Sequence, residues 1–181
     1  MESLHVIVDS REQKPFEFTD VGYNNVSVTR DILYIGDYSI FGCQNEIAIE
    51  RKSLPDLMNC LGRDRDRFIR QLQRGRGLES YSVVIEASWI DLAQGNYMAK
   101  IHPHAACQSI CSFIARMGIP FVFAGSRKAA EYIVYSILTQ YANGIRRRLR
   151  AVEAAMNPIQ PPQTMPRARV VRMQTMAQAG Q

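Results

Sequence analysis

The sequence has few of the features that mark secreted or membrane proteins. It contains only four cysteines, and no two of them form a Cys-x-x-Cys pair. This spacing favours free thiols in a reducing compartment over disulfide bonds. The longest apolar runs, such as Tyr132–Leu138, are far shorter than the roughly 20 residues that cross a bilayer, and no charged-then-apolar leader opens the chain. We therefore expect no membrane partner and a location in the cytoplasm, or in the nucleus if the source is a eukaryote.

A glycine-rich phosphate loop and an internal repeat are also absent from the sequence. The only cluster of zinc-ligand residue types consists of His102, His104, Cys107 and Cys111. Cys107 and Cys111 lie four residues apart on a predicted helix, so a zinc site is conceivable. We favour the interpretation that both cysteines are small core residues behind solvated histidines, because free cysteine is commonly buried.

The remaining composition is that of an ordinary soluble protein. Of the 181 residues, 46% are hydrophobic and 22% are charged, which predicts a single folded domain at residues 1–150. From Asn157 onward, prolines occur among Gln, Met, Ala and Arg without an apolar period. Residues 151–181 are therefore predicted to form a disordered tail.

The net charge of +5 is concentrated in two short blocks. Residues 63–76 contain six arginines and two acids, and residues 145–181 contain seven arginines and one acid. The rest of the chain is mildly acidic. Basic blocks of this kind suggest a polyanionic partner, such as a nucleic acid.

The hydrophobic pattern predicts an α/β fold with a mixed central sheet flanked by helices. β-Branched and aromatic runs predict strands at residues 4–9, 26–30, 33–41, 46–50, 81–87 and 119–124. Apolar residues at helical spacing predict helices at 54–61, 66–74, 103–117 and 126–141. A turn at 42–45 predicts a hairpin between its flanking strands, and with 26–30 these would form a three-stranded meander.

Acidic side chains stand at the ends of strands in the first third of the chain. Asp9 and Glu12 follow the first strand, Asp37 lies within the third and Glu50 ends the fourth. Asp37 and Glu50 flank a tight turn, so antiparallel pairing can place them side by side. Two such carboxylates repel each other unless a hard divalent cation lies between them. The pattern predicts a Mg²⁺ site formed by Asp37 and Glu50, with Glu12 in support.

A lysine accompanies the acids. Lys52 follows Glu50 by two residues and therefore points to the same side of an extended strand. Such a lysine can hold an attacking hydroxide or stabilise the charge that develops on a phosphate in the transition state. The arrangement suits a metal-dependent phosphodiesterase, although acids and lysines at strand ends are usually only solvated.

Four motifs in a fixed order are more specific. Residues 36–37 (GD), residues 50–52 (ERK) and Asp56 reproduce the signature G-D-x(n)-E-R-K-x-x-x-D. Residues 8–12 (VDSRE) match a first motif, and residues 66–68 (DRF) with Gln71 match an arginine helix. Over about residues 4–143 the chain resembles the nuclease domain of the XPF family of structure-specific DNA endonucleases, which includes the archaeal Hef nuclease.

The resemblance implies a restriction-endonuclease-like core, a Mg²⁺ or Mn²⁺ cofactor and incision of one DNA strand near a single-strand to double-strand junction. It also implies that Lys52 is the catalytic lysine. The implied metal ligands are Glu12, Asp37, Glu50 and the main-chain carbonyl of Arg51. The residues implied to shape the catalytic site are Asp9, Arg11, Arg51 and Asp56.

Some of these residues also have structural interpretations. Asp56 lies three residues after Ser53, which is the spacing of a helix cap, and Pro55 is an accepted first-turn proline. Arg11 and Arg51 can be ion-pair partners of Asp9 or Glu50. Glu86, at the end of a predicted buried strand, is a further candidate for the surroundings of the site.

The two basic blocks supply candidate DNA contacts. The arginines of the first block would contact phosphates, or would form a solvated surface. The run at 146–150 would be a second backbone contact, or a helix end whose cations complement the helix dipole. The candidate DNA-binding residues are Arg63, Arg67, Arg70, Gln71, Arg74, Arg76, Arg146, Arg147 and Arg148.

The chain departs from the family pattern after Asn143, where many relatives carry a helix-hairpin-helix pair and this chain is arginine- and proline-rich. We expect a small, bacterial or phage-encoded endonuclease for branched or single-strand-bearing DNA, acting in repair, recombination or replication. The apolar helices at 103–117 and 126–141 suggest a homodimer through the nuclease core. The alternatives are a sequence- or lesion-specific nuclease on the same core, and a catalytically silent DNA-binding subunit.

Overall fold

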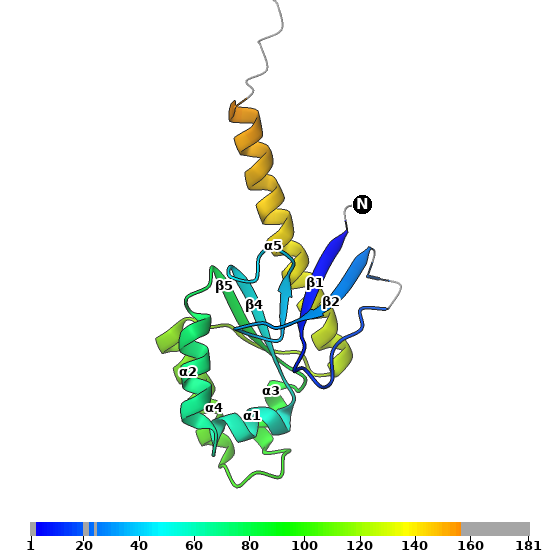
Figure 1. Cartoon of the computed structure of the whole chain (residues 1–181). Helices are drawn as coiled ribbons and strands as arrows, with labels where there is room; N and C mark the ends of the chain where they lie inside the picture. The colour runs from blue at the N-terminus through cyan, green and yellow to red at the C-terminus, as the bar shows by residue number, and fades with distance from the viewer. Residues whose placement is uncertain (1–2, 20–21, 24, 157–181) are drawn as a thin grey trace, which may run out of the picture. The chain divides into compact units, whose positions relative to one another are not determined.

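The computed structural model describes residues 3–19, 22–23 and 25–156 of the chain. Strands and helices alternate along most of this length (Figure 1). In chain order the elements are β1 (Leu4–Asp9), β2 (Val26–Asp31), β3 (Tyr38–Ile40), β4 (Ile47–Lys52), α1 (Leu54–Leu61), α2 (Arg65–Gly75), β5 (Ser80–Ile85), α3 (Trp89–Gln94), α4 (Pro103–Met117), β6 (Phe121–Phe123) and α5 (Arg127–Met156).

The described strands form one mixed sheet in the order β2-β1-β3-β4-β5-β6. β1 pairs in parallel with β2, and β4, β5 and β6 pair in parallel with one another, whereas β3 is antiparallel to both of its neighbours. All strands except β3 therefore run in the same direction. Their carboxyl ends meet at one edge of the sheet, and the amino end of β3 lies at the same edge.

The predicted α/β architecture is confirmed, but the predicted three-stranded meander is wrong. β3 and β4 form the expected hairpin, whereas β2 is an outermost strand of the sheet and pairs with β1. The alternating pattern of β2 indicates a strand but does not identify its partner, because pairing is decided by the tertiary arrangement. β3 is also shorter than predicted, and so Asp37 lies immediately before it rather than within it.

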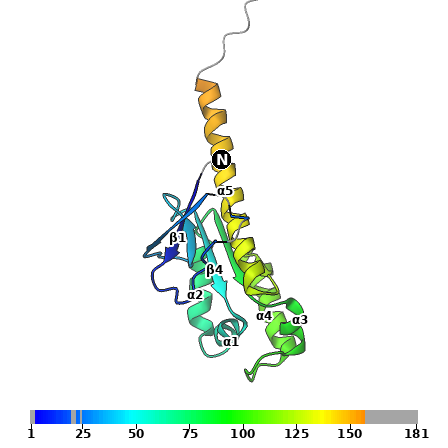
Figure 2. The ribbon, with the colours of Figure 1, turned by 90° about the vertical axis from the view of Figure 1, so that its right-hand side faces the viewer.

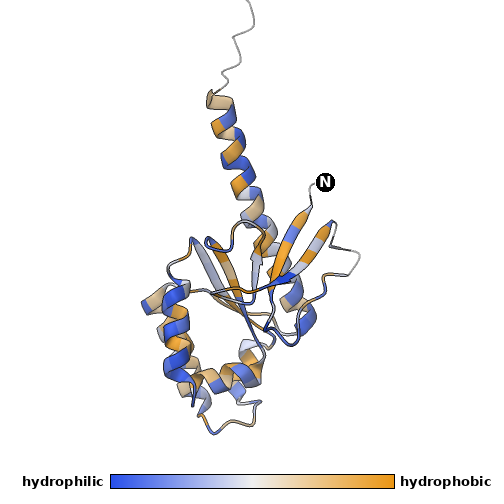
Figure 3. Cartoon of the chain, in the orientation of Figure 1, coloured by the Kyte–Doolittle hydropathy of each residue, from blue (hydrophilic) through white to orange (hydrophobic). Residues whose placement is uncertain are grey.

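Side-chain alternation along β4 divides its residues between two hydrophobic cores. Ala48 contributes to a core that includes residues of α1, α2 and α4. Ile47 and Ile49 contribute to a second core, built with residues of α5 and with Phe16. α2 and α5 consequently cover opposite faces of the sheet (Figure 2), and apolar residues are concentrated in the strands between them (Figure 3).

The start of α1 confirms the predicted helix cap. The Ser53 hydroxyl accepts the main-chain N–H of Asp56 at 3.3 Å and donates to its carboxylate at 2.6 Å, with Pro55 in the first turn. α3 is absent from the sequence prediction. Its signal is a capping box, in which Ser88 and Asp91 each bond the other's main-chain N–H. The helix is only six residues long, so its apolar period is too short to detect.

α5 extends further than the predicted end at Tyr141. Residues 1–146 belong to one compact unit, which is close to the predicted domain of residues 1–150, and the helix continues through residues 147–156 in the second unit. Residues 151–156 of the predicted tail are thus helical, and the rest of that tail lies outside the described residues. No helix in the described part of the chain is both long and apolar enough to span a membrane.

Gly36 brings the chain from β2 into β3 through a position that only glycine fits. Its φ is +74°, in the left-handed region that disfavours other residues. A Cβ atom at Gly36 would lie 2.9 Å from the Cβ of Ala48 and 3.0 Å from the carbonyl oxygen of Ile49. The loop therefore approaches the β4 backbone more closely than any side chain allows, and this contact places Asp37 beside β4.

We expect Gly36→Ala to lower the free energy of unfolding by about 2 to 4 kcal/mol, because it adds a steric clash to the cost of a positive φ. Gly42→Ala is the matched control: its φ is +84°, and no atom lies within 4 Å of the added Cβ. That variant should lose only about 1 kcal/mol. Urea unfolding of both variants measures the difference, and equal losses would contradict the role of the close approach.

Candidate active site

A cavity of about 920 Å³ opens at the carboxyl edge of the sheet. The ends of β1 and β4, the start of β3 and one face of α2 contribute to its wall. Asp37, Glu50 and Lys52 line it, together with Arg67 and Arg74 of α2. The structure thus brings together the acids and the lysine that the sequence predicts as a site.

Glu50 and Lys52 point to the same face of β4, as their spacing predicts. Glu50 is buried and uses both of its carboxylate oxygens: Oε1 accepts Lys52 Nζ, and Oε2 accepts the side-chain amide of Gln71 on α2. Burial lowers the pKa of Lys52, but the charge of Glu50 outweighs this effect and the net pKa is raised. Lys52 therefore stays protonated at neutral pH, and Gln71 holds Glu50 in place instead of pointing into solvent.

Asp37 lies at the start of β3 on the same face of the sheet. Its Oδ2 accepts the main-chain N–H of Arg51 at 2.7 Å, and the side chain keeps part of its surface open to the cavity. Burial raises the pKa of Asp37 well above its usual value, and the negative charge of Glu50 raises it further. Glu50 is thus close enough to disfavour the ionised form of Asp37.

Asp37 and Glu50 fit a hard divalent cation. Mg²⁺ in proteins usually takes one or two carboxylates together with water and phosphate oxygens, and a cation here would relieve the repulsion that raises the pKa of Asp37. Within residues 3–19, 22–23 and 25–156, no three His, Cys, Asp or Glu side chains converge into a preformed metal site. Asp37 and Glu50 are therefore candidate ligands, and the predicted contributions of Glu12 and of the Arg51 carbonyl remain predictions.

The carboxylate of Asp9 accepts hydrogen bonds that fix the loop after β1. Its carboxylate accepts the main-chain N–H, Nε and Nη2 of Arg11 at 2.7, 2.9 and 2.7 Å, and the main-chain N–H of Leu33 at 2.9 Å. Burial raises the pKa of Asp9, but the hydrogen bonds from Arg11 outweigh it and leave the pKa below the usual value. The predicted pairing of Arg11 with Asp9 is confirmed, and Asp9 connects the loop after β1 to the loop after β2.

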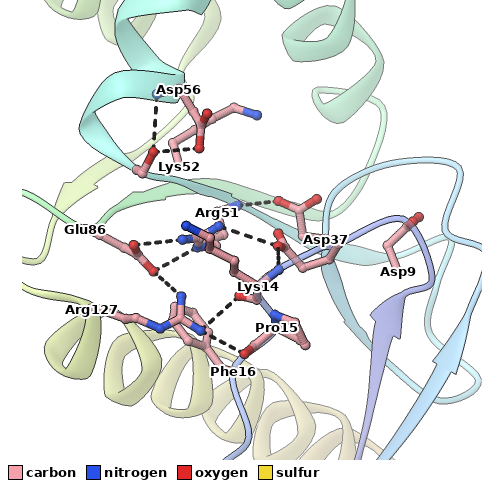
Figure 4. A network of polar contacts seen from close by, with 12 residues as sticks. Asp9, Lys14, Pro15, Phe16, Asp37, Arg51, Lys52, Asp56, Glu86 and Arg127 are labelled. Atoms are coloured by element: carbon pink, nitrogen blue, oxygen red, sulfur yellow. Dashed lines mark hydrogen bonds and ion pairs between the residues drawn. The ribbon is translucent and has the colours of Figure 1, made fainter. Parts of the chain in front are cut away.

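The side chain of Arg51 lies on the opposite face of the sheet from Glu50. The predicted alternative of an Arg51–Glu50 pair is wrong, because adjacent strand residues alternate between faces. Arg51 instead donates Nε and Nη2 to the carboxylate of Glu86, both at 2.8 Å, and its Nη1 lies 3.5 Å from Glu12 Oε1 (Figure 4). Arg127 at the start of α5 completes the network, with Nη1 2.7 Å from Glu86.

This network fixes the segment that carries Glu12. Arg127 Nη2 donates to the carbonyl oxygens of Lys14 and Pro15 at 2.9 and 2.8 Å, and its guanidinium lies over the Phe16 ring. The buried hydroxyl of Tyr38 accepts the main-chain N–H of Phe16 at 2.9 Å, so this tyrosine also holds the segment in place. Arg127 does not feature in the sequence prediction. Its only signal is its position at the start of a helix that Ser126 caps.

The predicted DNA-binding arginines divide into two groups. Arg67, Gln71 and Arg74 line the cavity, whereas Arg63, Arg70 and Arg76 do not. Arg146 lies at the opposite edge of the sheet, where its Nη2 is 3.4 Å from the carbonyl oxygen of Ser3, next to the amino end of β1. Arg146 therefore lies away from the acids, and its predicted role as a second DNA backbone contact stays a prediction. Arg147 and Arg148 belong to the second unit.

The zinc-like cluster does not form a metal centre in the described part of the chain. The side-chain nitrogen of His102 accepts the main-chain N–H of His104 at 3.3 Å and so caps α4. Cys107 is half-buried against the core, but Cys111 is exposed, so the predicted core position is wrong for Cys111. The residues of α4 that face the core are Ala106, Ile110 and Phe113, and this helical spacing leaves Cys111 outside the buried face.

The fold and the cavity define a class of protein: a mixed α/β sheet flanked by helices, with two carboxylates and a lysine at one edge. The family model of the ERCC4 domain matches residues 8–137. The chain belongs to the ERCC4 domain family, a family of structure-specific DNA nucleases.

The solved structures that are similar to this chain include two of XPF. XPF from Aeropyrum pernix has 18% sequence identity and a TM-score of 0.61, and the match covers 86% of this chain and 75% of that one. XPF from Aeropyrum pernix in complex with DNA has 19% identity and a TM-score of 0.60, and the match covers 78% of this chain and 66% of that one. A search of the curated proteins gives no match. At these identities the structural likeness establishes the fold.

We expect Glu86→Ala to lower the free energy of unfolding by about 3 kcal/mol, because it removes the main partner of a buried arginine. The side chains of Arg51 and Glu86 are only 7% and 12% exposed. Arg63→Ala, which breaks the exposed pair with Asp64, serves as the control and should change stability by less than about 0.5 kcal/mol. Chemical denaturation of both variants measures the two losses. A Glu86→Ala variant as stable as the control would show that Arg51 does not depend on Glu86.

Proposed function

We propose that this chain is a divalent-metal-dependent endonuclease that hydrolyses a DNA phosphodiester near a single-strand to double-strand junction. The observation that carries the proposal is the grouping of Asp37, Glu50 and Lys52 in one cavity that Arg67 and Arg74 of α2 also line. Carboxylates that favour a cation and a fixed ammonium group are what the transition state of phosphodiester hydrolysis needs.

Asp37 and Glu50 would hold a Mg²⁺ or Mn²⁺ ion, which when bound supplies an activated water and positive charge at the phosphate. Lys52 keeps its proton because Glu50 raises its pKa, and its ammonium group would stabilise the negative charge of the transition state. Gln71 and Lys52 together orient the carboxylate of Glu50. Arg67 and Arg74 would bind backbone phosphates and position the strand, without reading its sequence.

DNA as the substrate is supported by the ERCC4 domain and by the similar XPF structure determined in complex with DNA. The cytoplasmic location, the bacterial or phage source, and the role in repair, recombination or replication are part of this proposal. So is a homodimer through the nuclease core, which the exposed Ile114 of α4 and Tyr132 of α5 support.

We expect the protein to cleave labelled flap or fork DNA with Mg²⁺ or Mn²⁺ and to leave it intact with EDTA. Asp37→Asn should reduce the rate by at least about 100-fold, because it removes a charge from the cation site, and Lys52→Ala should reduce it by a similar factor. Single-turnover cleavage assays of both variants, beside nicked and plain duplex DNA, measure these effects.

Lys100→Ala is the control, because Lys100 is exposed and does not line the cavity. Cleavage that persists in EDTA, or full activity in both site variants, would contradict the catalytic assignment. A silent DNA-binding subunit would shift the DNA in a gel and leave it uncut under every condition.

The positions of the α2 arginines lead to a separate prediction about DNA binding. Arg67→Ala and Arg74→Ala should each reduce the salt dependence of DNA binding by about one unit of slope, because each removes about one phosphate contact. Arg76→Ala should leave the slope unchanged, because Arg76 lies outside the cavity. Fluorescence anisotropy over a salt series measures the slopes. Equal effects at all three positions would show that the whole arginine block acts as a diffuse basic surface.

A further inference from the structure

Tyr34 is the most exposed aromatic residue in the described chain, and its backbone is held firmly on both sides. It lies in the loop between β2 and β3, and its side chain is 89% exposed. The preceding residue, Leu33, is buried, and its main-chain N–H and carbonyl bond to Asp9 and to Arg11 Nη2 at 2.9 and 2.5 Å. These contacts fix the direction in which the loop presents the tyrosine ring.

The residues after Tyr34 are equally constrained. Ile35 packs against the hydrophobic core that includes α1 and α2. Gly36 is in van der Waals contact with β4 through the close approach that its missing side chain allows. An outward-pointing ring between two anchored residues loses little conformational entropy when it binds a flat partner, so Tyr34 is a preorganised surface.

Tyr34 lines the same cavity as Asp37 and Glu50. Among the described residues that line this cavity, Tyr34 is the only aromatic one, and most of the others are charged. A flat apolar ring beside phosphate-binding cations is the combination that single-stranded nucleic acids contact.

We propose that Tyr34 stacks on an unpaired base next to the phosphate in the cavity, and so makes the enzyme prefer DNA with a single-stranded arm. In a duplex both faces of each base are already stacked, so only an unpaired base offers a face to the ring. Arg11 supplies a neighbouring cation for the backbone of the same nucleotide: its guanidinium bonds to Leu33, and its side chain is 70% exposed. The inference rests on the proposed function in taking DNA as the ligand, but it does not require that the DNA be cleaved.

The test compares the full chain with Tyr34→Ala, Tyr34→Phe and Tyr34→Trp, using Ca²⁺ in place of Mg²⁺ to prevent cleavage. Tyr34→Ala should weaken binding of flap DNA by about fivefold to 100-fold, because one stacked base is lost. Binding of plain duplex should change by less than about twofold, since duplex bases have no free face. Tyr34→Phe and Tyr34→Trp should keep the affinity for flap DNA, because both retain a ring.

A fluorescent base shows whether the contact is stacking. 2-Aminopurine placed at successive positions of the single-stranded arm should be quenched by the unchanged protein at one or two adjacent positions near the junction. The quenching should persist with Tyr34→Phe and disappear with Tyr34→Ala. Phe41→Ala is the matched control: Phe41 is an exposed aromatic that stacks on His5, near the opposite edge of the sheet, and its removal should leave both signals intact.

The outcomes separate this inference from the proposed function. If the protein binds flap DNA and Tyr34→Ala binds it equally well with the same quenching, the stacking inference is overturned while the proposed nuclease stands. If the stacking signals appear but no DNA is cut with Mg²⁺ or Mn²⁺, the inference holds and the catalytic proposal fails. Failure of the unchanged protein to bind any DNA overturns both. A Tyr34→Ala variant that keeps its DNA affinity but loses self-association would assign the ring to a protein interface and overturn the inference.

Discussion

β4 ends in three consecutive charged residues, Glu50, Arg51 and Lys52. Each of these charges needs a partner inside the protein, and the partners come from the elements on both faces of the sheet. Alternation along the strand sends Glu50 and Lys52 to one face of the sheet and Arg51 to the other. On the first face, α2 supplies Gln71 to Glu50, and Asp37 lies immediately before β3. On the second, Glu86, directly after β5, and Arg127, at the start of α5, surround Arg51. One short strand thereby ties the elements of both layers to the same edge of the sheet.

The two faces of β4 have different surroundings. The face with Glu50 is open to the cavity, and its acids are close enough to raise the pKa of Asp37, a state that a bound cation relieves. On the other face, Arg51, Glu86 and Arg127 also line the cavity, but Arg51 and Glu86 are largely buried and their charges are paired with each other and with Arg127. Arg127 also bonds the main-chain carbonyls of residues 14–15. These contacts hold the loop after β1 against the edge that carries the acids.

Much of this was predictable because the motifs are local. The spacing of Glu50 and Lys52 predicts a shared face, and the spacing of Ser53 and Asp56 predicts a cap; the structure confirms both. The pairing of Arg11 with Asp9 is also local and also confirmed. Arg51 was harder, because its partner Glu86 lies 35 residues away and follows a different strand. Arg127 is more distant still, and no pattern around it indicates that α5 begins at the site.

The sequence by itself determined most of the elements, the class of fold and the acids that the structure groups at one edge of the sheet, because periodicity and motif spacing act over a few residues. It could not determine the partner of β2 or the position of Arg146 relative to the acids. Both depend on contacts between residues far apart in the sequence, because the strands pair so that both faces of the sheet are buried. The exposure of Tyr34 is of the same kind: Leu33 is buried and Ile35 packs against the core on either side, and this packing leaves Tyr34 exposed at the cavity.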